Sequence, residues 1–198
     1  MSCGEGGALI VNSPELVERA HFIQEKGTDR SLVLKGVRNK YSWVDLGSSF
    51  LLSDILAAML LTQLEHTEKI IEKRSKVTAA YYKLYKKYEQ AGFLQLPRIP
   101  EGVIINHHAF FVIFDTEINQ QKFLDLLREN SIYAYIGYVP LHSSPMGRKI
   151  GYKPHKIPRT EDIAKRIVRL PLYTDLPEQG LDYCIKGMSN ALMQIYHL

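Results

Sequence analysis

The sequence predicts a mixed α/β chain that ends in a small α+β domain. Residues 53–92 contain no proline and no glycine before Gly92, and their apolar residues recur at helical spacing. Residues 103–114 (VIINHHAFFVIF) are dense in β-branched and aromatic side chains, which is typical of a strand. An amphipathic segment, a second strand and a terminal amphipathic segment follow, and this order is that of an α+β domain.

The first 52 residues are expected to hold a strand, a helix and a loop. The apolar residues 8–12 predict a short strand. Ser13 followed by Pro14 and an acidic residue is typical of a helix start, and Gly27 is expected to stop that helix. Residues 27–50 show no clear period, so we expect an irregular region of the kind that often carries sites.

Residues 53–92 predict one long helix, with Ser53 as its N-cap and Gly92 at its end. At a rise of 1.5 Å per residue an unbroken helix would measure about 58 Å, more than the width of a small domain. Three alternatives follow: the helix bridges two domains, it breaks near His66 and Thr67, or it packs on a partner chain. Its apolar first half and charged second half favour a passage from a buried to an exposed environment.

The residues after Gly92 predict the elements of the small domain. A proline-punctuated connection precedes the strand at 103–114. We then expect a helix at 119–130, a strand at 131–140, a long basic loop at 141–162, a short helix at 161–168, a strand or turn at 169–173 and a helix at 176–198.

The composition limits the class of protein to which the chain can belong. The 198 residues are 45% hydrophobic and 23% charged, as in ordinary soluble globular proteins. No apolar run approaches the roughly 20 residues of a membrane span, and we see no signal-peptide pattern. Two cysteines, Cys3 and Cys184, make no disulfide framework. We therefore expect a cytoplasmic protein without a membrane partner.

The net charge of +4 is mild, but basic residues gather in 69–87 and 148–169. Solvated helix faces explain most of them. The alternative is that these basic residues attract an anionic ligand such as a nucleotide. A nucleic-acid partner is not expected, because neither stretch belongs to a nucleic-acid-binding motif.

Two short motifs suggest chemistry that their context does not support. The glycines of GEGG at 4–7 precede a predicted strand, whereas a phosphate loop follows a strand and opens a helix. A close approach between backbones is the better interpretation. The adjacent His107 and His108 would point to opposite faces of a strand, so we expect no shared metal and no metal site.

Two loops carry better candidates. Tyr138 and His142 lie in a loop bounded by proline and glycine after a predicted strand, where they could bind a polar ligand or exchange protons. Ser48 and Ser49 lie just before the long helix and could bind phosphate, although turn and cap roles explain them equally well.

Taken together, several segments resemble the DegT/DnrJ/EryC1/StrS family of sugar aminotransferases. They are CGEGGALIVN, EKGTDRS, KYSWVDLGSSFLLSDILAAMLLTQLE, NHHAFFVIF, GYVPLHSSPMG and RLPLY, in that order. The resemblance implies the C-terminal portion of the pyridoxal-phosphate (PLP)-dependent, aspartate aminotransferase-like fold. Residues 1–52 would be a remnant of the PLP-binding major domain, 53–92 a long interdomain helix and 93–198 the small α+β domain.

The resemblance also implies a reaction and its partners. The family's amino transfer, usually from glutamate, goes to the 4-keto carbon of a dTDP-sugar, with PLP as cofactor, in synthesis of surface polysaccharides such as enterobacterial common antigen. The Schiff-base lysine would lie before Met1, so we expect no catalytic residue in this chain and no activity from it alone. A homodimer or a complementing N-terminal half is the expected partner.

The site residues implied by the resemblance are secondary ones. The segment matching Gly47–Phe50 reaches across the family's dimer, which makes Ser48 and Ser49 candidate contacts for the cofactor phosphate. His108, Tyr138 and His142 match segments that line the sugar-nucleotide side of the cleft. A non-catalytic binding or dimer-partner module is the alternative function.

Overall fold

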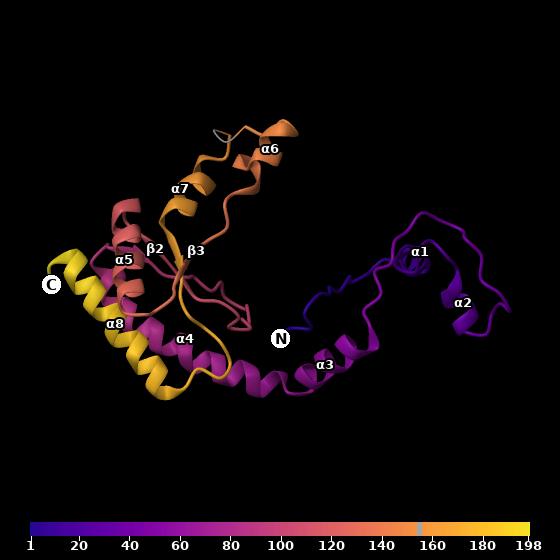
Figure 1. Ribbon diagram of the computed structural model, residues 1–198, viewed down its shortest axis with the longest axis horizontal. Helices are drawn as coiled ribbons and strands as arrows, with labels where there is room; N and C mark the ends of the chain where they lie inside the picture. Colours follow the sequence, from indigo (N-terminus) through magenta and orange to yellow (C-terminus); the bar gives the residue numbers. More distant parts are fainter. Residues whose placement is uncertain (154–155) are drawn as a thin grey trace. The chain divides into compact units, whose positions relative to one another are not determined.

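The computed structural model describes residues 1–153 and 156–198 and divides into two compact units, Met1–Thr67 and Glu68–Leu198 (Figure 1). The first unit contains α1 (Pro14–Gln24), α2 (Arg30–Leu34) and α3 (Asp54–Glu65). Helix α1 begins as its sequence predicts, with Ser13 extended at the N-cap and Pro14 in the first helical position. The Ser13 hydroxyl makes no capping hydrogen bond among the described residues, whereas the expected cap of α3 is present, since the Ser53 hydroxyl accepts a hydrogen bond from the Leu56 N–H.

Two expectations for the N-terminal segment are wrong. Residues 8–12 form no strand, and the side chains of Leu9 and Ile10 are 80% and 82% exposed. A strand needs a neighbouring segment to pair its backbone groups, and none lies beside these residues in the first unit. The glycines at 4–7 make no close backbone approach: a Cβ at Gly6 would meet side-chain atoms of Cys3 and Leu52 instead.

The helical segment 53–92 is interrupted, which is the second of the three alternatives. Helix α3 ends at Glu65 and α4 (Thr67–Gln90) begins after His66. The His66 ring Nδ1 lies 2.8 Å from the Thr62 carbonyl, and the Thr67 hydroxyl donates to the Leu64 carbonyl at 2.7 Å. Side chains that bond to backbone groups in this way compete with the regular helical pattern.

The second unit contains four further α-helices and one 3₁₀ turn among its described residues. They are α5 (Glu117–Glu129), η1 (Leu141–Ser143), α6 (Pro145–Lys149), α7 (Pro158–Arg166) and α8 (Glu178–Tyr196). Helices α5 and α8 lie close to their expected positions. Within the described residues 141–153 and 156–162, the predicted basic loop contains η1, α6 and the start of α7, while its positions 154 and 155 lie outside the described residues.

Four short strands form one antiparallel sheet. They are β1 (Leu94–Gln95), β2 (Phe111–Phe114), β3 (Tyr135–Ile136) and β4 (Ile167–Arg169), in the order β1-β2-β4-β3. The predicted helix at 161–168 ends at Arg166, because the chain enters β4 there. The last strand in sequence therefore lies between β2 and β3.

Strand β2 is much shorter than the predicted 103–114. His107 adopts a positive φ of 50°, which a strand does not allow. The side-chain oxygen of Asn106 accepts a hydrogen bond from the His108 N–H at 3.2 Å. The same oxygen lies 2.8 Å from the His108 Nδ1. These local bonds replace sheet pairing until the chain reaches Phe111.

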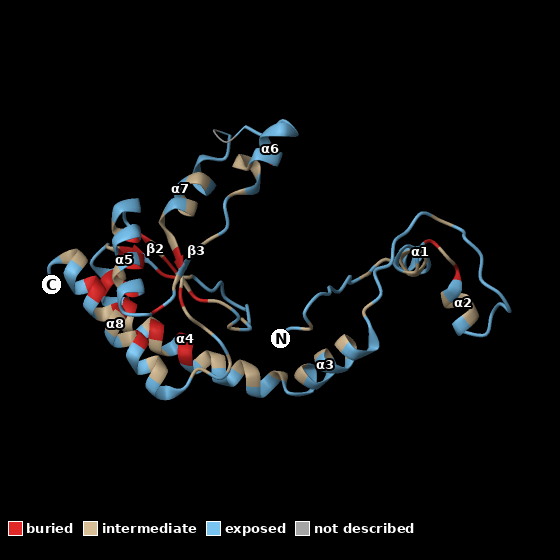
Figure 2. Ribbon diagram, in the orientation of Figure 1, coloured by how far each residue is buried: buried red, intermediate tan, exposed pale blue. Residues whose placement is uncertain are grey.

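The hydrophobic core belongs to the second unit (Figure 2). Tyr81, Tyr85 and Tyr88 form a buried stripe at helical spacing on α4. They pack with α5, α8 and the inner positions of the sheet, and Figure 1 shows these three helices next to β2. In the first unit, all of whose residues are described, only Gly27 and Asp29 are buried.

No helix in the described part of the chain combines the length and apolar character needed to cross a bilayer.

The tyrosine stripe yields a prediction about stability. The Tyr85 hydroxyl is buried without a hydrogen-bond partner among the described residues, whereas the Tyr81 hydroxyl donates to the Pro171 carbonyl at 2.5 Å. Tyr85→Phe removes an uncompensated polar group and should raise the free energy of unfolding by about 1 kcal/mol. Tyr81→Phe should lower it by about 1–2 kcal/mol, because it leaves a buried carbonyl without its donor.

Urea denaturation monitored by circular dichroism measures the free energy of unfolding of both variants. Both changes remove one hydroxyl from a fully buried ring of the same helix. Destabilisation by Tyr85→Phe equal to that by Tyr81→Phe would contradict the assignment of the Tyr85 hydroxyl as unpartnered.

Candidate functional site

The region 27–50 of the first unit, expected to be irregular, is held by backbone pairing that begins at Glu25. Isolated bridges join Glu25 to Ser49 and Thr28 to Trp43. The Lys26 N–H donates to the Ser48 carbonyl at 3.1 Å, and the Ser48 N–H donates to the Ile23 carbonyl at 3.0 Å. The segment that carries the two candidate serines is thereby fixed against the end of α1.

Two glycines make this pairing possible. Gly27 has a φ of +74°, and a Cβ built on it would overlap the carbonyl of Asp45. A Cβ on Gly47 would overlap the backbone nitrogen of Gly27. Only glycine permits backbones this close. The close approach that the sequence suggested for GEGG is therefore found at Gly27 and Gly47.

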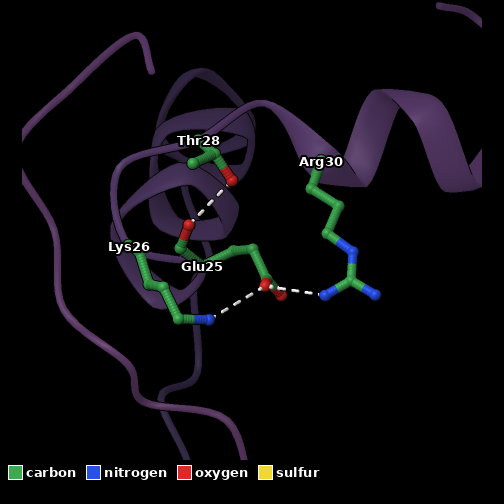
Figure 3. Close-up of polar contacts among 4 residues, drawn as sticks. All are labelled: Glu25, Lys26, Thr28 and Arg30. Carbon is green, nitrogen blue, oxygen red and sulfur yellow. Dashed lines mark hydrogen bonds and ion pairs between the residues drawn. The ribbon is translucent and has the colours of Figure 1, made fainter. Parts of the chain in front are cut away.

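Ion pairs between charged side chains stabilise the same region of the first unit. The buried carboxylate of Asp29 accepts a hydrogen bond from the Ser42 N–H at 2.6 Å. It also forms an ion pair with the Arg38 guanidinium. Glu25 accepts from Lys26 at 3.4 Å and from Arg30 at 3.1 Å, as Figure 3 shows. A carboxylate satisfied in this way can be buried without a large desolvation cost.

A further ion pair joins Asp45 to Arg19. The Asp45 carboxylate accepts hydrogen bonds from the Leu46 N–H and from the Arg19 guanidinium, and these bonds lower the pKa of Asp45. The bonds favour the charged form of the carboxyl group. They fix the turn that leads from Trp43 to Gly47.

The side chains of Ser48 and Ser49 point to no partner within the described residues. Both residues are exposed, and neither hydroxyl makes a hydrogen bond in the described part of the chain. A hydroxyl carries one donor and two acceptor positions. The loop therefore presents two free hydroxyls on a fixed backbone, which is an arrangement able to bind phosphate oxygens.

A cleft of about 830 Å³ lies within the second unit, beside β3. It is lined by residues of 131–138 and 169–184, and Tyr138 is among them. The Tyr138 side chain is 88% exposed, so it stands at the rim rather than in the wall. Of the three predicted substrate contacts, only Tyr138 lines this cleft.

His142 is held by a different neighbour. Its side chain is 11% exposed, and its Nε2 lies 2.7 Å from Oε1 of Glu161 on α7. The two atoms are in close contact without the alignment of a hydrogen bond, and neither has another partner in the described residues. The contact fastens η1 to α7.

The two neighbouring histidines contact separate partners. The His107 Nδ1 lies 2.8 Å from the Thr78 hydroxyl on α4, which is the structural role the sequence favours. His108 is exposed and contacts Asn106. Within the described residues, no group of three His, Cys, Asp or Glu side chains is placed to hold a metal ion.

Sequence reasoning missed the wall of the cleft. The sequence pattern shows Arg169 only as the end of the basic stretch 148–169, yet the sheet register places it directly opposite Tyr135 of β3 and Phe111 of β2. No local pattern shows such a register, because it depends on pairing between segments more than 30 residues apart in the chain.

Comparison with known proteins places the chain among aminotransferases. The profile of the DegT/DnrJ/EryC1/StrS aminotransferase family matches residues 1–189. The chain is 28% identical over 187 residues to a pleiotropic regulatory protein of Geobacillus stearothermophilus, covering 94% of this chain and 47% of the relative. It is 28% identical over 180 residues to dTDP-4-dehydro-2,3,6-trideoxy-D-glucose 4-aminotransferase of Saccharopolyspora spinosa, covering 88% and 45%.

A solved structure agrees in fold. The PLP form of Spr1654 from Streptococcus pneumoniae, described as a sugar aminotransferase, aligns with a TM-score of 0.77 at 17% identity, over 93% of this chain and 45% of that one. The chain spans about half the length of the relatives it matches. Its fold is the C-terminal portion of the PLP-dependent aminotransferase fold.

The glycine contact yields a second prediction. Gly27→Ala should weaken the pairing of 25–29 with 42–50 by about 2 kcal/mol or more, because it adds a steric overlap to an unfavourable φ. Hydrogen exchange of the Val44 and Asp45 amides measures this directly, since both donate to the Gly27 carbonyl. Both amides should exchange faster in the variant.

Gly36→Ala is the matched control. Gly36 has a similar φ of +72°, but a Cβ there would meet no atom within 4 Å. It should cost about 1 kcal/mol from the backbone conformation alone. Equal exchange at Val44 and Asp45 in the two variants would show that close packing is not the reason for glycine at position 27.

Proposed function

This chain belongs to the DegT/DnrJ/EryC1/StrS aminotransferase family, and we propose that it supplies the C-terminal part of a PLP-dependent sugar-nucleotide aminotransferase. The family match over residues 1–189 is the observation that carries the proposal. In this proposal residues 1–52 belong to the PLP-binding major domain, 53–92 connect the domains, and 93–198 form the small domain. The enzyme acts in the cytoplasm as a homodimer.

The proposed reaction moves an amino group from glutamate to the 4-keto carbon of a dTDP-4-keto-6-deoxyhexose. The segments KYSWVDLGSSF and YVPLHSSPMG support this choice through their likeness to dTDP-4-amino-4,6-dideoxygalactose transaminase. The dTDP-sugar named for the Saccharopolyspora spinosa relative supports the nucleotide. The product would enter synthesis of a surface polysaccharide such as enterobacterial common antigen.

The residues of the first unit fit the phosphate end of PLP. Ser48 and Ser49 offer two exposed hydroxyls on a backbone held by hydrogen bonds to Ile23 and Lys26. A hydroxyl that donates to a phosphate oxygen makes a short, charge-assisted hydrogen bond. PLP supplies the electron sink for amino transfer when it is bound. In the proposal these hydroxyls hold the phosphate of the cofactor across the dimer.

The proposed substrate contacts differ in how they are presented. Tyr138 stands at the rim of the cleft with its hydroxyl free of partners in the described residues. His108 is exposed, and its contact with Asn106 uses only Nδ1, which leaves Nε2 for a ligand. His142 presents its Nε2 to Glu161, so a substrate would meet the other edge of its ring.

A non-catalytic binding or dimer-partner module is the second candidate. Its support is the apolar surface of the first unit, where Trp43, Leu46 and Ile55 are each at least 76% exposed. Large apolar side chains gathered on a surface favour association with another protein surface. Such a module would complement a separate chain that carries the other half of the family's fold.

The activity of the chain by itself gives a third prediction. The purified chain, incubated with PLP and reduced with borohydride, should show no PLP adduct at a defined lysine by mass spectrometry. It should not aminate a 4-keto sugar nucleotide with glutamate as donor. A single modified lysine together with turnover would overturn the proposal that catalysis requires a further segment.

Co-expression of this chain with a partner chain distinguishes the aminotransferase from the binding module and gives a fourth prediction. The partner is a chain that matches the N-terminal half of a family member. Association with recovered amino transfer supports the aminotransferase. Association without activity supports the binding module, and neither association nor activity contradicts both.

Variants of the active pair then test the phosphate contact. Ser48→Ala with Ser49→Ala should weaken PLP binding about tenfold, measured by the absorbance of bound cofactor. Ser31→Ala in α2 is the control, since it removes a hydroxyl of the same unit that lies outside the paired segments 25–29 and 42–50. Equal losses in the two variants would remove Ser48 and Ser49 from the site.

A further inference from the structure

Strand β3 lies at one edge of the antiparallel sheet. The strand order β1-β2-β4-β3 gives it a single neighbour, β4. We call residues 133–137 (YAYIG), which contain β3, the edge segment. Within the part of the chain that the structure describes, no backbone-to-backbone hydrogen bond joins the edge segment to any element other than β4. Since alternate residues of a strand direct their N–H and C=O groups to opposite sides, the outer side of β3 offers backbone groups to a further strand.

The opposite edge of the same sheet is closed by side chains. Where the chain leaves β1, the Leu96 N–H donates to the Glu89 carboxylate at 2.9 Å, and the Pro97 carbonyl accepts from the Tyr82 hydroxyl at 2.9 Å. Glu89 and Tyr82 both belong to α4, which therefore occupies the backbone groups beside β1. Among the described residues, the open edge of this sheet is that of β3.

The edge segment lacks two features with which natural proteins protect an open edge, charged side chains and prolines. The segment contains neither, and no Asp, Glu, Lys or Arg occurs between Glu129 and Arg148. Tyr133, Tyr135 and Ile136 are each at least 55% exposed. Aromatic and β-branched residues favour strand pairing, so the segment combines an open backbone with side chains suited to a neighbouring strand.

We propose that the edge segment pairs antiparallel with the edge segment of a second copy of this chain. Its charge pattern favours a second copy as the partner. The segment itself is uncharged, so no like charges meet across the pair. The nearest charged residues in the sequence have opposite signs, with Glu129 before the segment and Arg148 after it. Antiparallel pairing sets the start of one segment on the side of the other's end, so the flanking charges are complementary.

The pairing ends at two copies. A contact that uses the same surface on both partners closes around a two-fold axis. Further copies do not add at β1, because Glu89 and Tyr82 close that edge. The product is a dimer rather than a fibre. The inference goes beyond the proposed amino transfer and does not rest on it, since the contact lies in the second unit, whereas Ser48 and Ser49 belong to the first.

Hydrogen exchange of the full chain at low and high protein concentration tests the pairing at its own residues. Sedimentation velocity reports the assembly under the same conditions. We expect a monomer that becomes a dimer as the concentration rises. Amides of 133–137 should then exchange at least severalfold more slowly, whereas those of 94–96 at the closed edge should be unchanged. This measurement does not depend on the folding of any variant.

Three results of that experiment overturn the proposal. A monomer at every concentration leaves the open edge to a strand of a different protein. A dimer in which the exchange of 133–137 is unchanged uses another surface. An assembly that grows beyond two copies contradicts a closed two-fold contact.

A charge placed on the open edge tests the same contact by substitution. Ile136→Lys should weaken dimerisation at least tenfold, because each copy then brings a lysine to the pair. Ile118→Lys is the matched control, since Ile118 is 67% exposed on α5, outside the edge segment. The control should dimerise as the unsubstituted chain does. Equal weakening in the two variants, or none in Ile136→Lys, contradicts the assignment of the contact to β3.

Discussion

The packing of Phe110 against the tyrosines of α4 holds the second unit together. The Phe110 ring meets Tyr82 edge-on at a centroid distance of 4.9 Å and lies 5.3 Å from Tyr81 and 6.4 Å from Tyr85. Its carbonyl accepts a hydrogen bond from the Leu170 N–H at 3.0 Å, which continues the pairing of β2 with β4. One residue thus joins the helix to the two central strands. Arg169, next in the chain to Leu170, takes its place in the cleft because of this contact.

Local signals in the sequence predict the helices well. The apolar spacing of α4, α5 and α8 and the caps at Ser13 and Ser53 act within a few residues, and each helix forms close to its expected place. The strands are predicted less well, because a strand is stable only where a distant segment pairs with it. The apolar residues 8–12 show this, since they have strand composition and no partner.

In the candidate site, too, features set by local signals could be predicted from the sequence, and features set by distant contacts could not. The irregular character of 27–50, which made it a candidate site region, could be predicted from its glycine content and the absence of a period, but the contact of Gly27 with the backbone at 45 and 47 could not. The contact of His142 with Glu161 joins residues 19 positions apart and depends on where α7 begins. The cleft wall is the extreme case, because its single charge is placed by the register of three strands.

The place of β4 between β2 and β3 also bears on how the chain is made. During synthesis from the N-terminus, β2 and β3 leave the ribosome before the strand that separates them, so β2 has only β1 as a sheet neighbour and β3 has none until residue 169 has emerged. Helix α8, which closes the core, is later still. Such late, non-local pairing slows folding and leaves apolar strands exposed meanwhile. Strand β3 of the nascent second unit therefore stays unpaired until most of the chain has been made.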